Sequence, residues 1–349
     1  MVILPAHSSI DEKKRDAFRN ALLDTRVWLL DTIAGGIAVA DTHPPDFWLR
    51  PAARLTDSGA KGASDLLREI ATHAQKENDT DKRHTFILTR LADLYLLMRT
   101  FERIETLSED AQAAAMITAG WNVTKKTLLG NPDDPTHDPN KYVRLADMWQ
   151  VVGQTQAPMP NNEAVKYRRT WLWGVTNQIF TLVLEFNFGD YTFEGTWQVG
   201  TQVTDEVIFY PDNGYRVLPV PAAEASTMNT NYTTIPATVF FGYENFSIFH
   251  ALYRAEIARS PFRRETPCAL MRVTPIRHEG ISYFLDDNQT MIPIAPLPDG
   301  IFTTLLMMSG GHPLAVFGEW NGYALSLFTV FENGTWWDVV KEVNSTLSK

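Results

Sequence analysis

The sequence predicts an α+β protein, in which an N-terminal α-helical bundle precedes a mostly antiparallel β domain with one inserted helix. Apolar residues recur at helical spacing through the first third of the chain, and from residue 142 onward the period falls to about two. A stretch rich in Pro and Asp separates the two patterns. We therefore expect a helical domain over residues 1–130, a linker over 131–141 and a β-rich domain over 142–349.

The helical part is predicted to hold four or five helices. The first begins near Glu12, where Ser9 fits a capping box three residues earlier, and it ends at Gly35-Gly36. Residues 42–50 contain two prolines and are expected to form a link. Further helices are expected over 51–77, 79–107 and 109–129, and the segment 79–107 has the widest apolar stripe.

The β-rich part shows short alternating segments separated by Asn, Gly and Pro. One helix is expected near 244–260, and residues 222–238 are expected to form a loop. Turns at Ser309-Gly310-Gly311, Asn321-Gly322 and Asn333-Gly334 predict a C-terminal β-meander of three hairpins. The expected strands are 146–154, 167–174, 179–188, 203–210, 214–220, 267–275, 281–285, 303–309, 313–318, 323–331 and 335–340.

Composition restricts the class of function. The formal net charge of −10 and the lack of a dense basic run argue against a nucleic-acid-binding surface. Cys268 is the only cysteine, so an intrachain disulfide and a multi-cysteine zinc site are excluded. With no apolar stretch of membrane-spanning length and no signal-peptide pattern, we expect a cytoplasmic protein without membrane association.

Motifs that carry chemistry are missing from the sequence. It contains no phosphate-binding GxxxxGK[ST], no nucleophile elbow GxSxG and no zinc-binding HExxH. Asp133, Asp134, His137 and Asp138 lie among prolines and are interpreted as a solvated turn. We therefore predict no catalytic residue, no metal and no cofactor. Two carboxylates brought together between the domains remain an alternative, because acid and base pairs meet only in the fold.

Two aromatic, strand-like cassettes are the most distinctive parts of the chain. They cover residues 166–188 and 301–337. Trp and Arg dominate interface energetics, so the cassettes supply the residues expected to contact a partner protein: Arg168, Arg169, Trp173, Glu319 and Trp320. The competing interpretation is that these residues pack a hairpin and form a local ion pair.

Several segments resemble the region downstream of the zinc finger in bacterial SWIM zinc finger family proteins. These are FWLRPAARLTDSGAKGASDLLREI, KYVRLADMWQVVGQ, RRTWLWG, EVIFYPDNGYRVLPV and SGGHPLAVFGEWNGYAL, in the same order as in the family. A SWIM finger needs a C-x-C…C-x-H quartet, which one cysteine cannot supply. The chain thus looks like the body of the family without its zinc module, and no catalytic residue is carried over.

The resemblance implies a role in a multi-protein assembly, since such genes are often encoded beside MoxR-type AAA ATPases and von Willebrand factor A-type proteins. We therefore expect a non-catalytic interaction or scaffold subunit with a protein partner, an AAA ATPase among the candidates. Two alternatives stay open. One is a hydrolase-like enzyme with carboxylates at the interdomain cleft, and the other is accessory nucleic-acid binding, which the net charge opposes.

Overall fold

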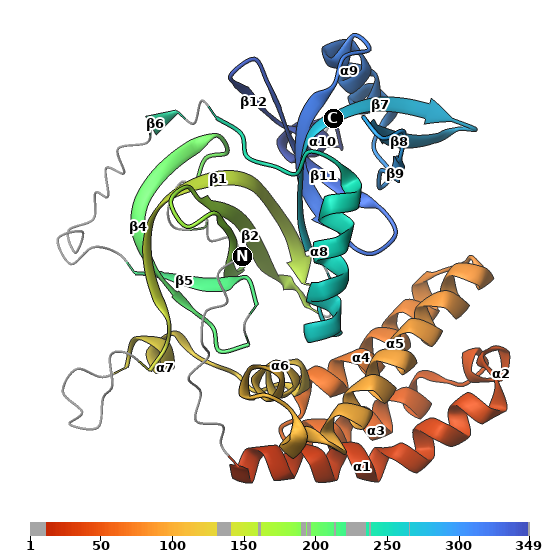
Figure 1. Ribbon diagram of the computed structural model, residues 1–349. Helices are drawn as coiled ribbons and strands as arrows, with labels where there is room; N and C mark the ends of the chain where they lie inside the picture. The colour runs from red at the N-terminus through yellow and green to blue at the C-terminus, as the bar shows by residue number, and fades with distance from the viewer. Residues whose placement is uncertain are drawn as a thin grey trace.

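The computed structural model has an α-helical bundle below two β-sheets (Figure 1). The residues that it describes are 12–130, 141–159, 162–189, 193, 197–212, 214–220, 235–236, 239–264 and 266–347. Ser9, the expected turn at 131–140 and nearly all of the expected loop at 222–238 lie outside these ranges. The α+β class is confirmed, with helices first and antiparallel-rich sheets after them.

The bundle consists of helices that bury apolar faces against one another. Its core includes Phe18, Leu22, Trp48, Leu91 and Phe101. Its helices are α1 (Glu12–Gly35), α2 (Ile37–Asp41), α3 (Pro45–Asp57), α4 (Lys61–Lys76), α5 (Thr80–Phe101), a 3-10 turn η1 (Ile104–Thr106), α6 (Glu109–Ala119) and α7 (Lys125–Leu129).

Three boundaries in the bundle differ from the predictions. The expected link at 42–50 is instead the start of α3, because Pro45 occupies the first helical position, where a missing N–H costs nothing. The expected helix at 51–77 is two helices, α3 and α4. Gly59, whose φ is 82°, lies in the turn between them, and Gly62 lets α4 approach α6, since a Cβ there would lie 2.1 Å from the carbonyl oxygen of Thr118. The expected helix at 109–129 ends at Gly120, whose φ is 122°, and α7 follows separately.

The first sheet closes on itself. Strand β1 pairs with β4 through its first half and with β2 through its second, so the order β1-β2-β3-β5-β4 returns to β1. All these pairings are antiparallel except β3 with β5. The strands are β1 (Arg144–Met159), β2 (Asn162–Gly174), β3 (Ile179–Phe188), β4 (Thr201–Phe209), β5 (Arg216–Val220) and, at the edge of β4, β6 (Ile235–Pro236).

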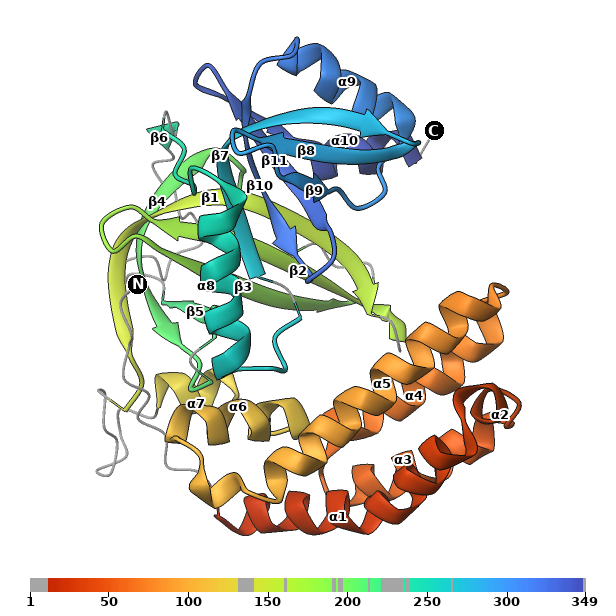
Figure 2. The same cartoon turned by 45° about the vertical axis from the view of Figure 1, so that its right-hand side comes forward.

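The second sheet is antiparallel throughout, in the order β12-β11-β10-β7-β8-β9. Helix α8 (Phe246–Arg259) precedes it and runs from this sheet towards the bundle, as two views show (Figures 1 and 2). Its elements are β7 (Thr266–His278), β8 (Ile281–Asp286), β9 (Met291–Pro293), α9 (Asp299–Ser309), β10 (Leu314–Trp320), β11 (Leu325–Glu332), β12 (Thr335–Asp338) and α10 (Val339–Leu347).

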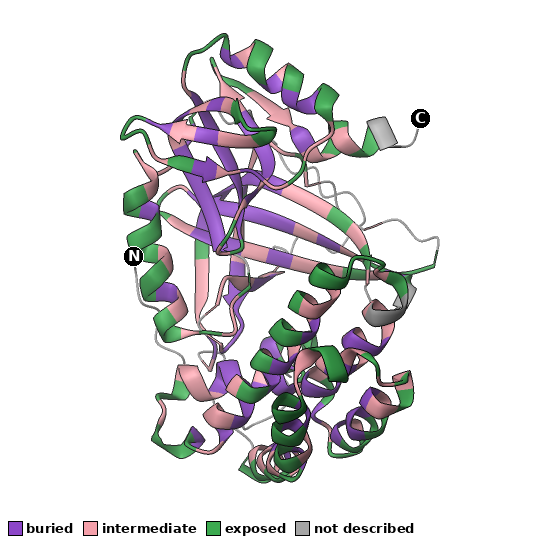
Figure 3. Ribbon diagram, turned by 90° about the vertical axis from the view of Figure 1, so that its right-hand side faces the viewer, coloured by how far each residue is buried: buried purple, intermediate pink, exposed green. Residues whose placement is uncertain are grey.

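The alternation of side chains along the strands builds three apolar layers. In β2, Leu172 points into the closed sheet, whereas Trp171 and Trp173 belong to the layer between the two sheets. In β10, Phe317 belongs to that same layer, and Val316 faces α9 and α10 on the other side. Buried residues accordingly run along both sheets and along the inner faces of the helices (Figure 3).

The predicted C-terminal meander is only partly right. Residues 303–309, predicted as a strand, belong to α9, and Ser309-Gly310-Gly311 is the end of that helix, with Gly310 in the left-handed conformation at φ 52°. Residues 335–340 hold β12 and the start of α10. The hairpin at Asn333-Gly334 is confirmed, since both residues have positive φ, and so is the turn at Asn321-Gly322.

Among the described residues, the bundle contacts the β region through α7 and through the segment at the end of α8. Helix α7 packs with β4 and β5 through Leu128, Ile208 and Leu218. After α8, Phe262 packs against the bundle core, and Arg264 forms an ion pair with Asp93 of α5. The second contact places the C-terminal end of α8 directly on the bundle.

Candidate functional site

The residues predicted to contact a partner lie mainly inside the molecule. Glu319 is 5% exposed, and its carboxylate accepts a hydrogen bond from the Trp171 indole at 2.6 Å and forms an ion pair with Arg169 at 2.6 Å. The three side chains come from β2 and β10, so they join the two sheets. This ion pair connects two sheets and is therefore not the local pair within a hairpin that was the competing interpretation.

The other predicted residues are buried as well. Arg168 is 5% exposed and donates to Glu185 on β3 at 2.7 and 2.9 Å. Trp173 is 6% exposed and stacks on Phe241, with ring centroids 4.1 Å apart. Trp320, at 5% exposed, lies against aromatic rings of α8. The expectation that these residues present an open surface is corrected, because their exposed area is too small to supply the core of an interface.

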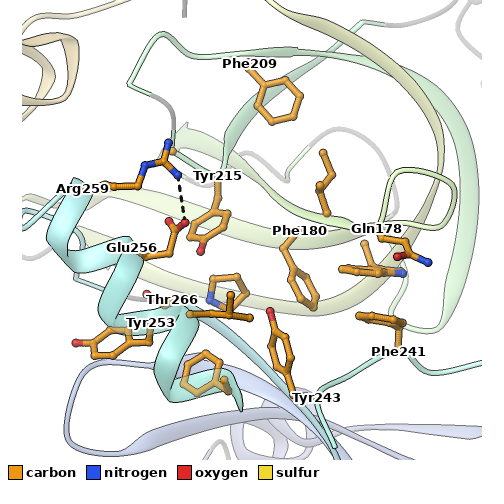
Figure 4. A pocket seen from close by; sticks show the side chains of 16 residues that line it. Gln178, Phe180, Phe209, Tyr215, Phe241, Tyr243, Tyr253, Glu256, Arg259 and Thr266 are labelled. Atoms are coloured by element: carbon orange, nitrogen blue, oxygen red, sulfur yellow. Dashed lines mark ion pairs between the residues drawn. The ribbon is translucent and has the colours of Figure 1, made fainter. Parts of the chain in front are cut away.

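A cavity of about 280 Å³ lies between α8, the closed sheet and the start of β7. Most of its lining side chains are apolar or aromatic, as expected for a ligand-binding pocket. Figure 4 shows rings from several elements surrounding it, with Arg259 at one end and Gln178 and Phe241 at the other. The lining consists of Trp173, Gln178, Ile179, Phe180, Phe209, Gly214, Tyr215, Phe241, Tyr243, Phe249, Leu252, Tyr253, Glu256, Arg259, Thr266 and Pro267.

Hydroxyl groups supply most of the polarity within these walls. Burial raises the pKa of Tyr243 to about 12, and it also raises the pKa of Tyr215, so both phenols are neutral at physiological pH. Thr266 is 3% exposed, and its hydroxyl has no hydrogen-bond partner among the described residues. Its oxygen is also shielded from solvent, so the unpaired hydroxyl lies behind the cavity surface and not on it.

An ion-pair cluster closes the end of the cavity nearest the bundle. Glu256 of α8 pairs with Arg263, and Arg259 lies 3.6 Å from Glu256 and 3.9 Å from Asp110 of α6. Burial raises the pKa of the Asp212 carboxyl, although Arg263 and Arg216 lie close enough to act in the opposite direction. Acidic and basic groups thus alternate here, and the charges largely compensate one another.

Between the bundle and the β region, Asp110, Asp212 and Glu256 line one small space. The space between them is only about 10 Å³, which is no more than one water molecule needs. A wider cleft of about 570 Å³ adjoins it between α5, α6 and the end of α8, and it is lined by Arg99, Arg103 and Arg259 besides Asp110. The carboxylates therefore face arginines rather than open space.

Four exposed apolar side chains gather around the opening of the cavity. Phe241 and Leu252 line it and are 41% and 36% exposed. Ile248 lies one turn before Leu252 on α8 and is 44% exposed. Tyr323, at 85% exposed, is close enough to Tyr253 of the cavity to contribute to the raised pKa of that phenol, which burial mainly causes. We call these four residues, Phe241, Ile248, Leu252 and Tyr323, the mouth patch.

Sequence reasoning missed the cavity and the mouth patch because their residues lie far apart in the chain. Only the helical spacing of Ile248 and Leu252 gave a signal, as two apolar residues that share one face of α8. Among the described residues, no group of three or more metal-ligating side chains converges. The described helices are all too short or too polar to cross a lipid bilayer. Cys268 is fully buried, and burial raises the pKa of its thiol.

Comparison with known proteins finds a family match for the helical bundle. Residues 13–118 match the family known as the SWIM-associated four-helix bundle domain, and this range covers nearly all of α1 to α6. No curated protein and no solved structure matches the chain. The resemblance to the region downstream of the finger in SWIM-family proteins is therefore confirmed for the bundle, which is similar to this domain.

Proposed function

We propose that this chain is a non-catalytic interaction subunit of a bacterial multi-protein assembly, which holds its partner through the mouth patch. The assembly would include a MoxR-type AAA ATPase and a von Willebrand factor A-type protein. These partner classes rest on the family resemblance. The mouth patch is the observation that supports a protein contact, because exposed apolar side chains around a concave site are typical of such surfaces.

The composition of the patch fits this role. Aromatic side chains are enriched in the cores of protein interfaces, and Phe241 and Tyr323 supply two rings at the opening. Phe241 is held in place by its stacking on Trp173, so little conformational freedom is lost when a partner covers it. The formal net charge of −10 also favours a protein over a nucleic acid as the partner.

The test is affinity purification of the tagged chain from its native host. Leu252→Arg places a charge in the mouth patch and should lower co-elution of the ATPase at least about tenfold, since a charge buried at an interface core costs well over 1.4 kcal/mol. Met307→Arg is the matched control, because Met307 is 70% exposed on α9, away from the patch. Equal co-elution with both variants, or recovery of the chain alone, would contradict the proposal.

An enzyme with interdomain carboxylates is the second candidate, and the raised pKa of Asp212 beside Glu256 is the observation that favours it. Chromogenic esters, phosphoesters and glycosides assayed with the purified chain distinguish the two. The interaction subunit should turn over none of them. Turnover that Asp212→Asn abolishes without lowering the melting temperature would favour the enzyme instead.

A further inference from the structure

We infer that the cleft between α5, α6 and the end of α8 binds a small organic phosphate, a phosphate monoester with a compact apolar body. The mouth patch plays no part in this site, so the inference goes beyond the proposed protein contact. It rests on the arginines in the lining of the cleft, on their incomplete pairing, and on the local charge and volume.

Three arginines from both parts of the molecule line this cleft. Arg99 and Arg103 are four residues apart near the C-terminal end of α5, and Arg259 is the last residue of α8. The end of α8 approaches the bundle at this place (Figure 2). Arginine suits a phosphate group, because its planar guanidinium can donate two parallel hydrogen bonds to phosphate oxygens.

The hydrogen-bonding capacity of these arginines is not used up within the protein. Arg103 is exposed and forms no ion pair with a described residue. Arg259 lies 3.6 Å from Glu256 and 3.9 Å from Asp110, and both distances are longer than a hydrogen bond. Arg99 pairs with Glu102 through Nη1, which leaves further N–H groups of its guanidinium for a ligand.

The local charge matches that of a phosphate monoester. Within the described part of the chain, Asp110 is the one acidic side chain in the lining, so the three arginines leave an excess of two positive charges. Glu102 and Glu256 lie nearby but outside the lining, and each has a further arginine partner, Arg26 and Arg263 respectively. A phosphate monoester carries about −1.5 to −2 charges at pH 7. It would neutralise this excess, whereas a carboxylate would leave one positive charge.

The rest of the wall favours a compact apolar body on the phosphate. Leu96, Ala111, Ala114 and Phe262 line the cleft besides the arginines. The volume of about 570 Å³ lies within the range of small-molecule sites. An ester that carries a ring can cover these apolar side chains while its phosphate reaches the guanidinium groups, and removal of apolar surface from water then adds to the affinity.

The experiment compares three probes by isothermal titration calorimetry on the full chain at pH 8. Phenyl phosphate is a dianion at this pH, phenyl sulfate is a monoanion of the same shape, and inorganic phosphate lacks the ring. Phenyl phosphate should bind about five- to tenfold more tightly than phenyl sulfate, because its second negative charge faces the arginines. It should bind at least about fivefold more tightly than inorganic phosphate, because the ring contacts the apolar wall.

Two substitutions with opposite expected effects test the location. Arg103→Gln removes an exposed guanidinium that has no ion pair among the described residues, and phenyl phosphate should bind at least about tenfold more weakly. Asp110→Asn removes the acidic lining residue and should strengthen binding about three- to tenfold, which a purely structural role would not do. Arg50→Gln on α3 is the matched control, since Arg50 is exposed and outside the lining, and it should bind as the wild type does. Melting temperatures establish that each variant is folded.

The inference is overturned if phenyl phosphate fails to bind saturably, or if phenyl sulfate or inorganic phosphate binds equally well. It is also overturned if Arg50→Gln weakens binding as much as Arg103→Gln, or if Asp110→Asn leaves binding unchanged. The probes need no partner protein, so this failure is separable from failure of the proposed function. Co-elution of the ATPase that Leu252→Arg lowers, without binding of phenyl phosphate, would leave the protein contact and remove only the organic phosphate.

Discussion

The interior between the two sheets and the cavity beside α8 are built from the same residue types, yet they differ in how their polar groups are paired. Between the sheets, the Trp171 indole and the Arg169 guanidinium both reach Glu319, and Thr329 donates to the Val152 carbonyl at 2.7 Å. Beside the cavity, where β7 pairs with β10, Thr266 and Trp320 each leave a polar atom unpaired among the described residues. Two regions of similar aromatic content can therefore differ in how completely their buried polar atoms are paired.

The largest expected effect comes from breaking the paired region at Glu319. Glu319→Ala leaves the Arg169 charge and the Trp171 indole without their shared acceptor inside the protein, and should lower the free energy of unfolding by about 3–5 kcal/mol. Urea denaturation measures the change. Glu206→Ala is the control, because Glu206 pairs with Arg144 in a partly exposed position, and its loss should cost less than about 1 kcal/mol. If both variants lost a similar free energy of unfolding, the inter-sheet ion pair would contribute no more than the Glu206–Arg144 pair does.

A second substitution tests how closely the inter-sheet core is packed. A Cβ at Gly153 would lie 2.9 Å from two ring atoms of Phe317, so Gly153→Ala should destabilise by about 1–3 kcal/mol through overpacking. A Cβ at Gly300 in α9 would have no atom within 4 Å, and Gly300→Ala should be neutral or slightly stabilising. Thermal unfolding of the two variants checks this; a loss at Gly300 as large as that at Gly153 would refute the packing argument.

A third prediction concerns an unpaired carboxylate within the closed sheet. Burial raises the pKa of Asp205 to about 6, and one of its carboxylate oxygens has no hydrogen-bond partner among the described residues. The folded state therefore holds a proton more tightly than the unfolded state does, and this contribution to stability falls as pH rises through about 4 to 6. Asp205→Asn should stabilise the protein at pH 8 by about 1–2 kcal/mol, after allowance for solvent screening.

Urea denaturation at pH 8 and near pH 4 measures this difference. The advantage of Asp205→Asn should shrink towards zero at the lower pH, where the native carboxyl is already neutral. Asp147 is its cross-strand neighbour. Burial acts to raise the pKa of the Asp147 carboxyl, but hydrogen bonds donated chiefly by the backbone amides of Thr176 and Asn177 outweigh burial and lower it, so Asp147→Asn should act in the opposite direction. An advantage at pH 8 that persists unchanged at pH 4 would disprove the assignment.

The smallest expected effect lies at the mouth patch. Leu252→Arg replaces a side chain that is 36% exposed, so the free energy of unfolding should change by less than about 0.5 kcal/mol. Chemical denaturation checks this. An unchanged free energy of unfolding would distinguish Leu252, which is expected to affect binding, from residues of the inter-sheet core, which are expected to affect stability. Destabilisation by about 2 kcal/mol or more would place Leu252 in the core instead.

The fold was predictable wherever the apolar period was long and unambiguous. Helix α5 and the hairpin at Asn333-Gly334 are examples. Helix α9 was predicted as a strand because IFTTLLMMS combines a short apolar run with β-branched threonines, and periodicity cannot separate helix from strand in such a run. In the structure, Thr303 and Thr304 donate to carbonyls four residues earlier, which satisfies their hydroxyls within the helix.

The candidate site was much less predictable. Trp173 and Trp320 were selected because Trp is common in interfaces, but the same residue fills cores, and the sequence does not state which neighbour covers it. The cavity combines residues from β3, the turn before β5, α8 and β7, which lie far apart in the chain. Which side chains meet at one cavity depends on their neighbours in three dimensions, so no single pattern along the chain could have identified this lining.

Arg259 connects the cavity with the boundary between the bundle and the β region. Its side chain lines the cavity and both interdomain clefts, and it lies between Glu256 of α8 and Asp110 of the bundle. A displacement of α6 away from α8 would separate Asp110 from this guanidinium and leave it with Glu256, so the electrostatic environment at this end of the cavity depends on the position of the bundle.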